Sequence, residues 1–320
     1  MKAAILRSPD APPEYGDFPD PIVLGGGETA ELVAAGIHPV VRSLASGRHY
    51  GSVGTWPLVP GVDGVVRTAE GTLAYTGGLP PPHGMLAERI AVPELRLALP
   101  RNADPVAIAG GVNPGLSSWL PLRARIGEVE QLGTVLLIGV TGMAGMLAVQ
   151  NAQILGAQRV VGLGRDPAGL ARAAQAGAIT VVMTGDRATN AAAILAALGD
   201  TTPSIVIDFL WGAPAETAFA ALGRRGLDED RANIAYVQIG AMAGPEAAVP
   251  ASLLRSRRIR ITGSGAGSVS IADIKSQLPV YMQLIADGRI DVPTQTFALP
   301  QISDAWAAST QSGRRVVVVP

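Results

Sequence analysis

The chain has 320 residues, a length that suits two domains of ordinary size. Hydrophobic residues make up 48% of it and charged residues 16%, which favours a large buried core and argues against wholesale disorder. The formal net charge of −1 argues against a general nucleic-acid or membrane-surface binder. The sequence contains no cysteine, which excludes disulfides, thiolate nucleophiles and thiolate metal sites.

Residues 1–116 alternate short apolar runs with glycine- and proline-rich turns, which predicts an irregular β domain. The apolar run near the start of the chain, Ala3–Leu6, is too short for a secretory signal, which needs roughly 7–15 apolar residues. No other run reaches the length of about 20 residues that a membrane span requires. We therefore expect a soluble, cytoplasmic protein without a membrane partner.

Residues 134–265 alternate apolar runs with segments of helical length, such as Gly145–Leu155 and Pro167–Ala176. Nearly continuous apolar strands are typical of a parallel sheet covered by helices on both faces. The sequence thus predicts an α/β fold with a doubly wound, six-stranded parallel sheet. The tail, 266–320, returns to short strands. The expected sheet strands are Thr134–Val140, Arg159–Gly164, Ile179–Thr184, Ser204–Leu210, Asn233–Gly240 and Arg258–Gly263.

Three glycines, Gly139, Gly142 and Gly145, join the first of these strands to its helix. Glycine permits the tight turn and lets the backbone approach a pyrophosphate, which the helix N-terminus attracts. The spacing departs from G-x-G-x-x-G, because Val140 occupies the position of the first glycine. A plain strand-to-helix turn is the alternative, but the five strands that follow favour a dinucleotide site. We expect Thr141, Met143 and Ala144 to line it with the glycines.

The second strand ends in Gly164-Arg165-Asp166. An NAD enzyme usually has an acidic residue there to hold the ribose hydroxyls, whereas an arginine can bind the 2′-phosphate of NADPH. Arg165 therefore predicts NADPH as the cofactor, with Gly164 leaving room for the phosphate. The alternative is an exposed loop arginine, with Asp166 capping the next helix.

Four segments occur in order along the chain: PLVPGVDGVV (57–66), HGMLAERIAVP (83–93), NPGLSSW (113–119) and GVTGMAG (139–145). This ordered set resembles the medium-chain dehydrogenase/reductase superfamily, in its zinc-independent, quinone-oxidoreductase-like branch. The zinc enzymes of that superfamily carry Gly-His-Glu where this chain reads Gly61-Val62-Asp63, and valine cannot bind a metal. The cysteine-lined lobe of those enzymes is also missing.

The resemblance implies a GroES-like catalytic domain (1–116 and 266–320) and a Rossmann NADPH-binding domain (117–265), with the cofactor in the cleft between them. Members of the branch use NADPH to reduce quinones or the double bond of α,β-unsaturated carbonyls (enones). Many are homodimers that pair their sheets edge to edge, and Arg258–Thr262 is the expected edge strand here. Its arginines indicate a solvated strand end rather than a nucleic-acid site.

Tyr50 and Asn113 are the expected catalytic residues. The segment Arg42–Tyr50 falls where the resemblance places side chains that face cofactor and substrate, and Tyr50 could stack there, donate a proton or simply pack. His38 is expected to make a local hydrogen bond. The expected substrate pocket comprises His49, Trp56, Phe209 and Trp211, although both tryptophans could equally be core. Further expected cofactor contacts are Ile239, Gly240, Gly263, Ser264, Gly265 and Arg314, the last with Arg315 as its neighbour.

Two alternatives to a quinone or enone reductase stay open at this point. One is a non-catalytic NADPH-binding protein that acts as a redox sensor or structural protein. The other is an enoyl-thioester reductase of the same branch. The sequence does not identify the physiological acceptor, because fold does not fix function.

Overall fold

A computed structural model of the chain describes residues 1–23, 27–93, 96–311 and 313–320. It divides into two compact units, one made of Met1–Pro114 and Leu278–Pro320 and the other of Gly115–Gln277. The sequence predicts boundaries after residues 116 and 265, so the second boundary lies later than expected. It lies later because helix α8 (Ile271–Ala286) begins within the second unit, where the Trp119 indole N–H donates to the Gln277 side chain at 2.9 Å.

The second unit is built on a six-stranded sheet in which every neighbouring pair is parallel. The strand order is β10-β9-β8-β11-β12-β13, so the order reverses between β8 and β11, and β13 lies at an edge, as expected. In such sheets, ligands bind at the carboxyl ends of the strands where the order reverses. The strands are β8 (Thr134–Ile138), β9 (Arg159–Gly164), β10 (Ile179–Val182), β11 (Pro203–Asp208), β12 (Ile234–Gln238) and β13 (Ile259–Gly263).

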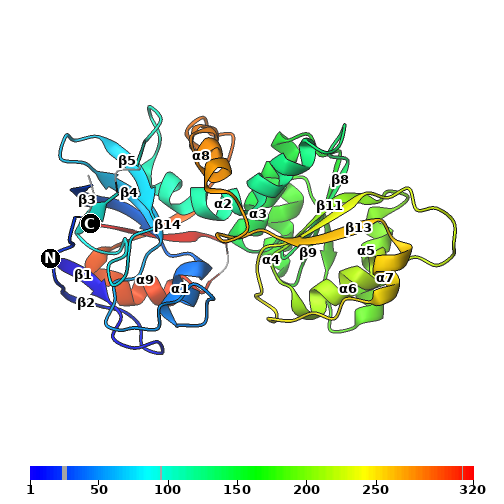
Figure 1. Cartoon of the computed structure of the whole chain (residues 1–320), viewed down its shortest axis with the longest axis horizontal. Coiled ribbons are helices and arrows are strands. Elements are labelled where there is room, and N and C mark those ends of the chain that lie inside the picture. Colours follow the sequence, from blue (N-terminus) through cyan, green and yellow to red (C-terminus); the bar gives the residue numbers. More distant parts are fainter. Residues whose placement is uncertain (24–26, 94–95, 312) are drawn as a thin grey trace. The chain divides into compact units, whose positions relative to one another are not determined.

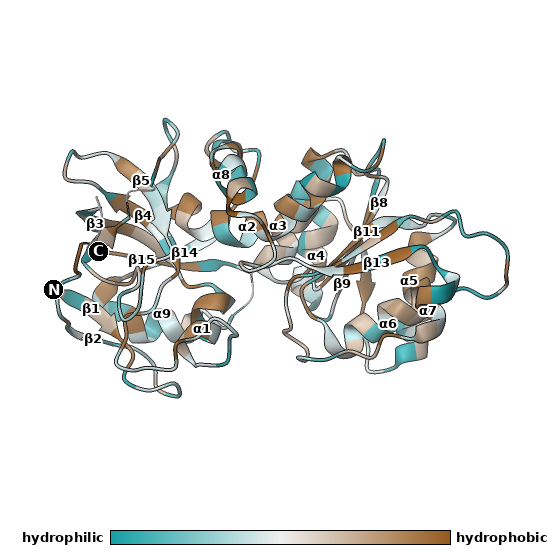
Figure 2. Ribbon diagram, viewed as in Figure 1, coloured by the Kyte–Doolittle hydropathy of each residue, from teal (hydrophilic) through white to brown (hydrophobic). Residues whose placement is uncertain are grey.

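Helices cover both faces of this sheet, because its strands carry apolar side chains on both sides. Val135 and Leu137 share a buried cluster with residues of α2 (Pro105–Ile126) and of two further helices, and Leu136 and Ile138 share another with residues of three different helices. Figure 1 shows the latter three helices on one side of the sheet. Figure 2 shows mostly hydrophilic residues in the loop that leads into β12. The helices are α3 (Met143–Ile154) and α4 (Pro167–Gln175) on one face, and α5 (Arg187–Leu198), α6 (Gly212–Leu222) and α7 (Ala251–Ser256) on the other.

The first unit is mainly β structure, as predicted. A small antiparallel sheet pairs β1 (Lys2–Ile5) with β2 (Glu14–Asp17), and a seven-stranded mixed sheet has the order β14-β15-β3-β4-β5-β7, with β6 beside β3. The tail returns to this unit, where β15 pairs antiparallel with β3. Its elements are β3 (Glu28–Gly36), α1 (Pro39–Ala45), β4 (Asp63–Arg67), β5 (Leu73–Gly77), β6 (Arg89–Val92), β7 (Leu97–Ala98), β14 (Thr294–Ala298), η1 (Leu299–Gln301), α9 (Ile302–Ala308) and β15 (Arg315–Val319).

Two helices contribute residues to both units. Helix α2 (Pro105–Ile126) contains the whole NPGLSSW segment, so Asn113 and Pro114 lie inside a helix at the boundary between the units. Helix α8 contains the second boundary. In the part of the chain that the structure describes, no helix has the length and apolar character needed to cross a membrane.

Candidate cofactor-binding site

The turn between β8 and α3 is shaped by its three glycines. Gly139 has a φ of +97°, a conformation that favours glycine. A Cβ atom on Gly145 would lie 2.3 Å from the Gly139 carbonyl oxygen, so the helix packs directly against the strand end. A Cβ on Gly142 would meet nothing within 4 Å.

Gly142 is also the N-cap of α3, and it provides no side chain to cap the helix. The first N–H groups of a helix have no partner inside the helix, and together with the helix dipole they attract anions. Met143 is buried in the first turn and Ala144 is half-buried. The turn therefore presents backbone donors to open space, as a pyrophosphate site requires.

Thr141 connects this turn to the next strand and helix. Its methyl carbon lies 2.3 Å from where a Cβ of Gly164 would be, and its Cβ lies 2.6 Å from the corresponding point of Gly169. The prediction that Gly164 leaves room for a phosphate is therefore wrong, because Thr141 fills that space. Arg165 is exposed, and Asp166 caps α4 by accepting the Gly169 N–H at 2.8 Å. The cap confirms the role considered as the alternative for Asp166.

Asp208 ends β11 and organises the loop after it, a role that the sequence analysis missed. Its side chain is fully buried and accepts the N–H groups of Leu210 at 2.8 Å and Trp211 at 2.9 Å, and the Tyr236 hydroxyl at 2.6 Å. Burial raises the pKa of this carboxyl. In the sequence, the signal that could have indicated this role of Asp208 is a single carboxylate at the end of an apolar run. A Cβ on Gly139 would lie 2.9 Å from Leu210 Cγ, so this loop closes one side of the phosphate turn.

The loops after β12 and β13 continue along the same edge of the sheet. The N–H groups of Ile239 and Gly240 donate to the Asp208 carbonyl at 2.7 and 3.2 Å. The Ser264 N–H donates to the last residue of β12 at 2.8 Å, and the Gly265 N–H donates to a serine hydroxyl at 2.9 Å. Gly263 is the last residue of β13. The structure thus brings the expected cofactor contacts of the second unit to the carboxyl ends of the strands.

The aromatic residues expected to line a substrate pocket pack mainly within their own units. Phe209 belongs to a buried cluster and is 8% exposed. Trp211 makes edge-to-face contacts with Phe219 and Tyr236, at centroid distances of 5.9 and 6.3 Å. Trp56 packs against the core of the first unit, and its indole N–H donates to a carbonyl of α1 at 3.2 Å. Core packing, considered for the tryptophans as an alternative, therefore accounts for all three rings.

The remaining expected site residues belong to the first unit. Tyr50 is 77% exposed in the loop after α1, and its ring lies 4.1 Å from that of His49. Asn113 is half-buried in α2, and Arg314 is exposed. Arg315, its expected companion, is instead buried in the core, where it donates to a backbone carbonyl at 3.0 Å. Burial lowers the pKa of Arg315 to about 10.

His38 takes part in a buried polar group rather than a local hydrogen bond. Its Nε2 atom lies 3.5 Å from an oxygen of Asp63 on β4, longer than an ordinary hydrogen bond. The other oxygen of Asp63 accepts the Tyr75 hydroxyl at 2.8 Å. Burial lowers the pKa of His38 and raises that of Tyr75. Among the described residues, no three His, Asp or Glu side chains are grouped so that they could hold a metal ion.

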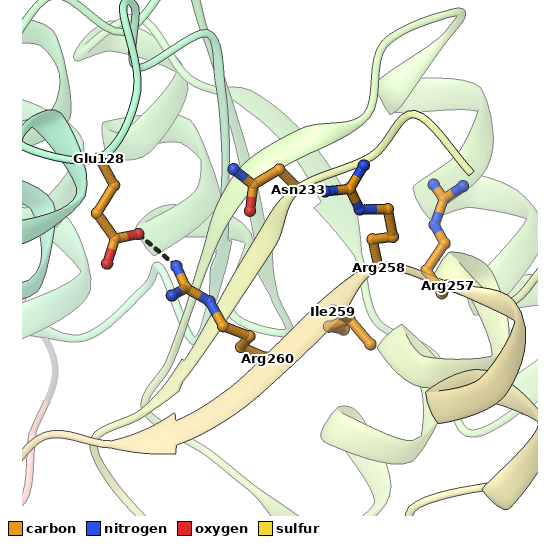
Figure 3. A pocket seen from close by; sticks show the side chains of 6 residues that line it. All are labelled: Glu128, Asn233, Arg257, Arg258, Ile259 and Arg260. Carbon is orange, nitrogen blue, oxygen red and sulfur yellow. Dashed lines mark hydrogen bonds and ion pairs between the residues drawn. The ribbon is translucent and has the colours of Figure 1, made fainter. Parts of the chain in front are cut away.

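The edge strand β13 borders a pocket of about 470 Å³ that is lined by several arginines. Figure 3 shows Glu128 facing Arg260, with which it makes an ion pair. Arg125, which is buried, donates to the same carboxylate at 2.6 Å, and Arg257 pairs with Asp230 at 3.3 Å. Two arginines of the basic cluster, Arg257 and Arg260, therefore have carboxylate partners.

Comparisons with known proteins relate this chain to dehydrogenases and quinone oxidoreductases. A family model described as zinc-binding dehydrogenase matches residues 144–287. A protein of Emericella nidulans named as a probable NADPH-dependent quinone reductase is 30% identical, with 100% of both chains covered. A quinone oxidoreductase from Thermus thermophilus, solved alone and with NADPH, has a TM-score of 0.79 at 23% identity, with 100% of both chains covered. A mycobacterial quinone oxidoreductase has a TM-score of 0.81 at 20% identity, with the same coverage.

Proposed function

Because this chain belongs to the medium-chain dehydrogenase/reductase superfamily, in its quinone-oxidoreductase-like branch, we propose that it is an NADPH-dependent reductase of quinones or enones. The likeness to solved structures confirms the predicted pairing of a GroES-like unit with a Rossmann unit. The observation that carries the proposal is the β8–α3 turn, where Gly142 leaves the uncapped helix N-terminus open to a pyrophosphate. The relative's name supports NADPH and a quinone as reactants.

The residues of the second unit fit the proposed cofactor. The N–H groups at the start of α3 would bind the pyrophosphate, and exposed Arg165 would bind the 2′-phosphate. The loops after β12 and β13, with Gly240 and Ser264, would border the nicotinamide. They lie at the carboxyl end of the sheet, the end at which such folds hold their ligands, on the side of the switch point that β11 begins.

Bound NADPH supplies the hydride, and the protein orients the acceptor and excludes water from it. Tyr50 would donate its phenolic proton to the oxygen of the reduced acceptor, or stack against a flat ring. Its 77% exposure leaves the hydroxyl accessible to a ligand, and its stacking on His49 restrains the ring. Asn113 would supply a further hydrogen-bond donor from α2.

The reaction would proceed without zinc. The position that carries a histidine ligand in the zinc enzymes of the superfamily is Val62 here, and the sequence has no cysteine. The family model's description refers to zinc, but the residues it matches, 144–287, contain no histidine. Acceptor polarisation would therefore depend on hydrogen-bond donors such as Tyr50.

The protein would act as a cytoplasmic homodimer. Among the described strands, β13 pairs on one side only, and such edges readily pair with another chain. Pairing with a second β13 would extend the sheet across the two copies. The ion pair of Arg260 with Glu128 would limit charge repulsion between the two edges.

The proposal is tested by NADPH consumption with a panel of quinones and enones, in the presence and absence of a zinc chelator. We expect turnover with at least one acceptor, a preference for NADPH over NADH, and the same rate with chelator. Tight NADPH binding without turnover of any acceptor would overturn the enzymatic role. Loss of activity on chelation would overturn the zinc-free mechanism.

A further inference from the structure

The turn from β9 into α4 has a second arginine whose hydrogen bonding is incomplete. Arg172 lies on α4, and long helical side chains point back towards the helix N-terminus. Its Nη2 atom lies 3.8 Å from Asp166 Oδ2, and the two side chains are 35% and 40% exposed. Within the described residues, Nε and Nη2 of Arg172 are buried without a hydrogen-bond partner.

The carboxylate beside Arg172 already has another role. Asp166 Oδ2 accepts the Gly169 N–H at 2.8 Å and so holds the first turn of α4. At 3.8 Å, Arg172 compensates the charge of Asp166 without a hydrogen bond of ordinary length. Although Nε and Nη2 are buried, the Arg172 side chain is 35% exposed, so the exposed part of its guanidinium can meet an anion.

The formal charges at this turn indicate what a second arginine would contribute to phosphate binding. Asp166 stands next to the position where an acidic residue favours NAD, and an uncompensated carboxylate there would repel a 2′-phosphate. Arg165 and Arg172 together with Asp166 give this turn a formal charge of +1, which favours a phosphate. Without Arg172 the formal charge would be zero.

We propose that Arg172 is a second specificity residue for the 2′-phosphate of NADPH, which neutralises Asp166 and offers a guanidinium beside that of Arg165. The inference rests on the proposed function, since it requires NADPH to lie across this turn. A purely structural role, as a partner of the α4 N-cap, would affect all ligands of the unit equally. A specificity role affects only ligands that carry the 2′-phosphate.

The test compares 2′,5′-ADP with 5′-AMP, which differ only in the 2′-phosphate, by calorimetric titration of the full-length protein. The variants are Arg172→Met, Arg172→Lys and the control Arg187→Met. Arg187 is a matched control because it also lies near a helix N-terminus and pairs with a carboxylate, Glu216, at 3.3 Å. We expect Arg172→Met to reduce the preference for 2′,5′-ADP by about 5- to 20-fold, because it removes a charge-assisted contact. Arg172→Lys should lose less, and Arg187→Met should match the wild type.

Two results would overturn the inference while leaving the proposed function intact. In one, Arg172→Met keeps the wild-type preference. In the other, it weakens binding of both nucleotides equally, which would indicate a structural role. If the wild type binds neither fragment and no NADPH, the proposed function itself fails, and the Arg172 proposal with it.

Discussion

Gly142 and Gly145 belong to one turn but are constrained by different surroundings. A Cβ on Gly145 would lie 2.3 Å from the Gly139 carbonyl, whereas a Cβ on Gly142 would meet nothing within 4 Å. Gly145→Ala should therefore destabilise the fold by about 1–3 kcal/mol, because the backbone at the end of the strand cannot move away from the added methyl group. Gly142→Ala should leave stability almost unchanged and weaken NADPH binding at least about tenfold, because the methyl would occupy the proposed pyrophosphate space. Thermal unfolding of both variants measures the effect on stability, and NADPH titration measures the effect on cofactor binding.

Equal losses of stability in the two variants would contradict this description of the turn. Unchanged NADPH affinity in Gly142→Ala would show that no ligand approaches that glycine.

His38 predicts a specific pH dependence of stability. Burial lowers its pKa, so the folded protein favours neutral imidazole while the unfolded chain accepts a proton near the ordinary value of about 6.5. Its stabilising contribution is therefore complete above about pH 6.5 and is lost as the pH falls below that value. Between about pH 7 and 5, the unfolding temperature should fall less steeply in His38→Gln than in the wild type.

His83→Gln provides the control, since His83 is partly exposed and bonds only weakly, to a backbone carbonyl at 3.3 Å. This variant should keep the wild-type slope. Parallel slopes for His38→Gln and the wild type would show that His38 is not the titrating group.

Residues whose geometry is local could be predicted from the sequence, and those with distant partners could not. The glycines at 139, 142 and 145 and the cap at Asp166 depend on neighbours within a few positions. The pairing of His38 with Asp63, by contrast, depends on which strand follows which in the sheet. The filling of the space at Gly164 by Thr141 likewise requires the two turns to be packed together.

At the level of elements, the strands of the parallel sheet were predicted well because most are nearly continuous apolar runs, and the edge strand β13 alternates isoleucine with polar residues. Helix α2 was not predicted, since Asn113, Pro114 and the following glycine are typical of a turn. The helix nevertheless runs through them, and Leu122 in its second half belongs to a buried cluster of the sheet. Tertiary packing thus overrides the local propensity of this segment.

The β11–α6 loop depends on one carboxylate for its conformation. Trp211 has a φ of +56°, which is strained for a bulky residue, and the bond from its N–H to Asp208 holds it there. Asp208→Ala would leave this N–H, that of Leu210 and the Tyr236 hydroxyl without their acceptor. We expect a loss of about 2–5 kcal/mol, measured by urea denaturation.

The exposed Asp200, just before β11, provides the control. Asp200→Ala should remain within about 0.5 kcal/mol of the wild type. A comparably small effect of Asp208→Ala would show that the aromatic packing of Trp211, rather than the carboxylate, holds the loop.

At the scale of the whole molecule, the proposed dimer depends on the free edge of β13. Thr262 is exposed on this strand, and a lysine there would add to the positive charge of Arg258 and Arg260. Thr262→Lys should therefore shift the protein from dimer to monomer, as measured by sedimentation velocity. Thr180→Lys, on the opposite edge strand β10, should remain dimeric. A monomeric wild type, or a dimer that Thr180→Lys disrupts instead, would exclude pairing through β13.

NADPH binding to the second unit, with Arg165 selecting the 2′-phosphate, underlies the proposed function. The most direct test is an equilibrium titration of the wild type and of Arg165→Ala with NADPH and NADH. We predict that the wild type prefers NADPH, and that Arg165→Ala weakens NADPH binding about tenfold while NADH binding stays the same. Failure of the wild type to bind either nucleotide, or an unchanged preference in Arg165→Ala, would contradict it.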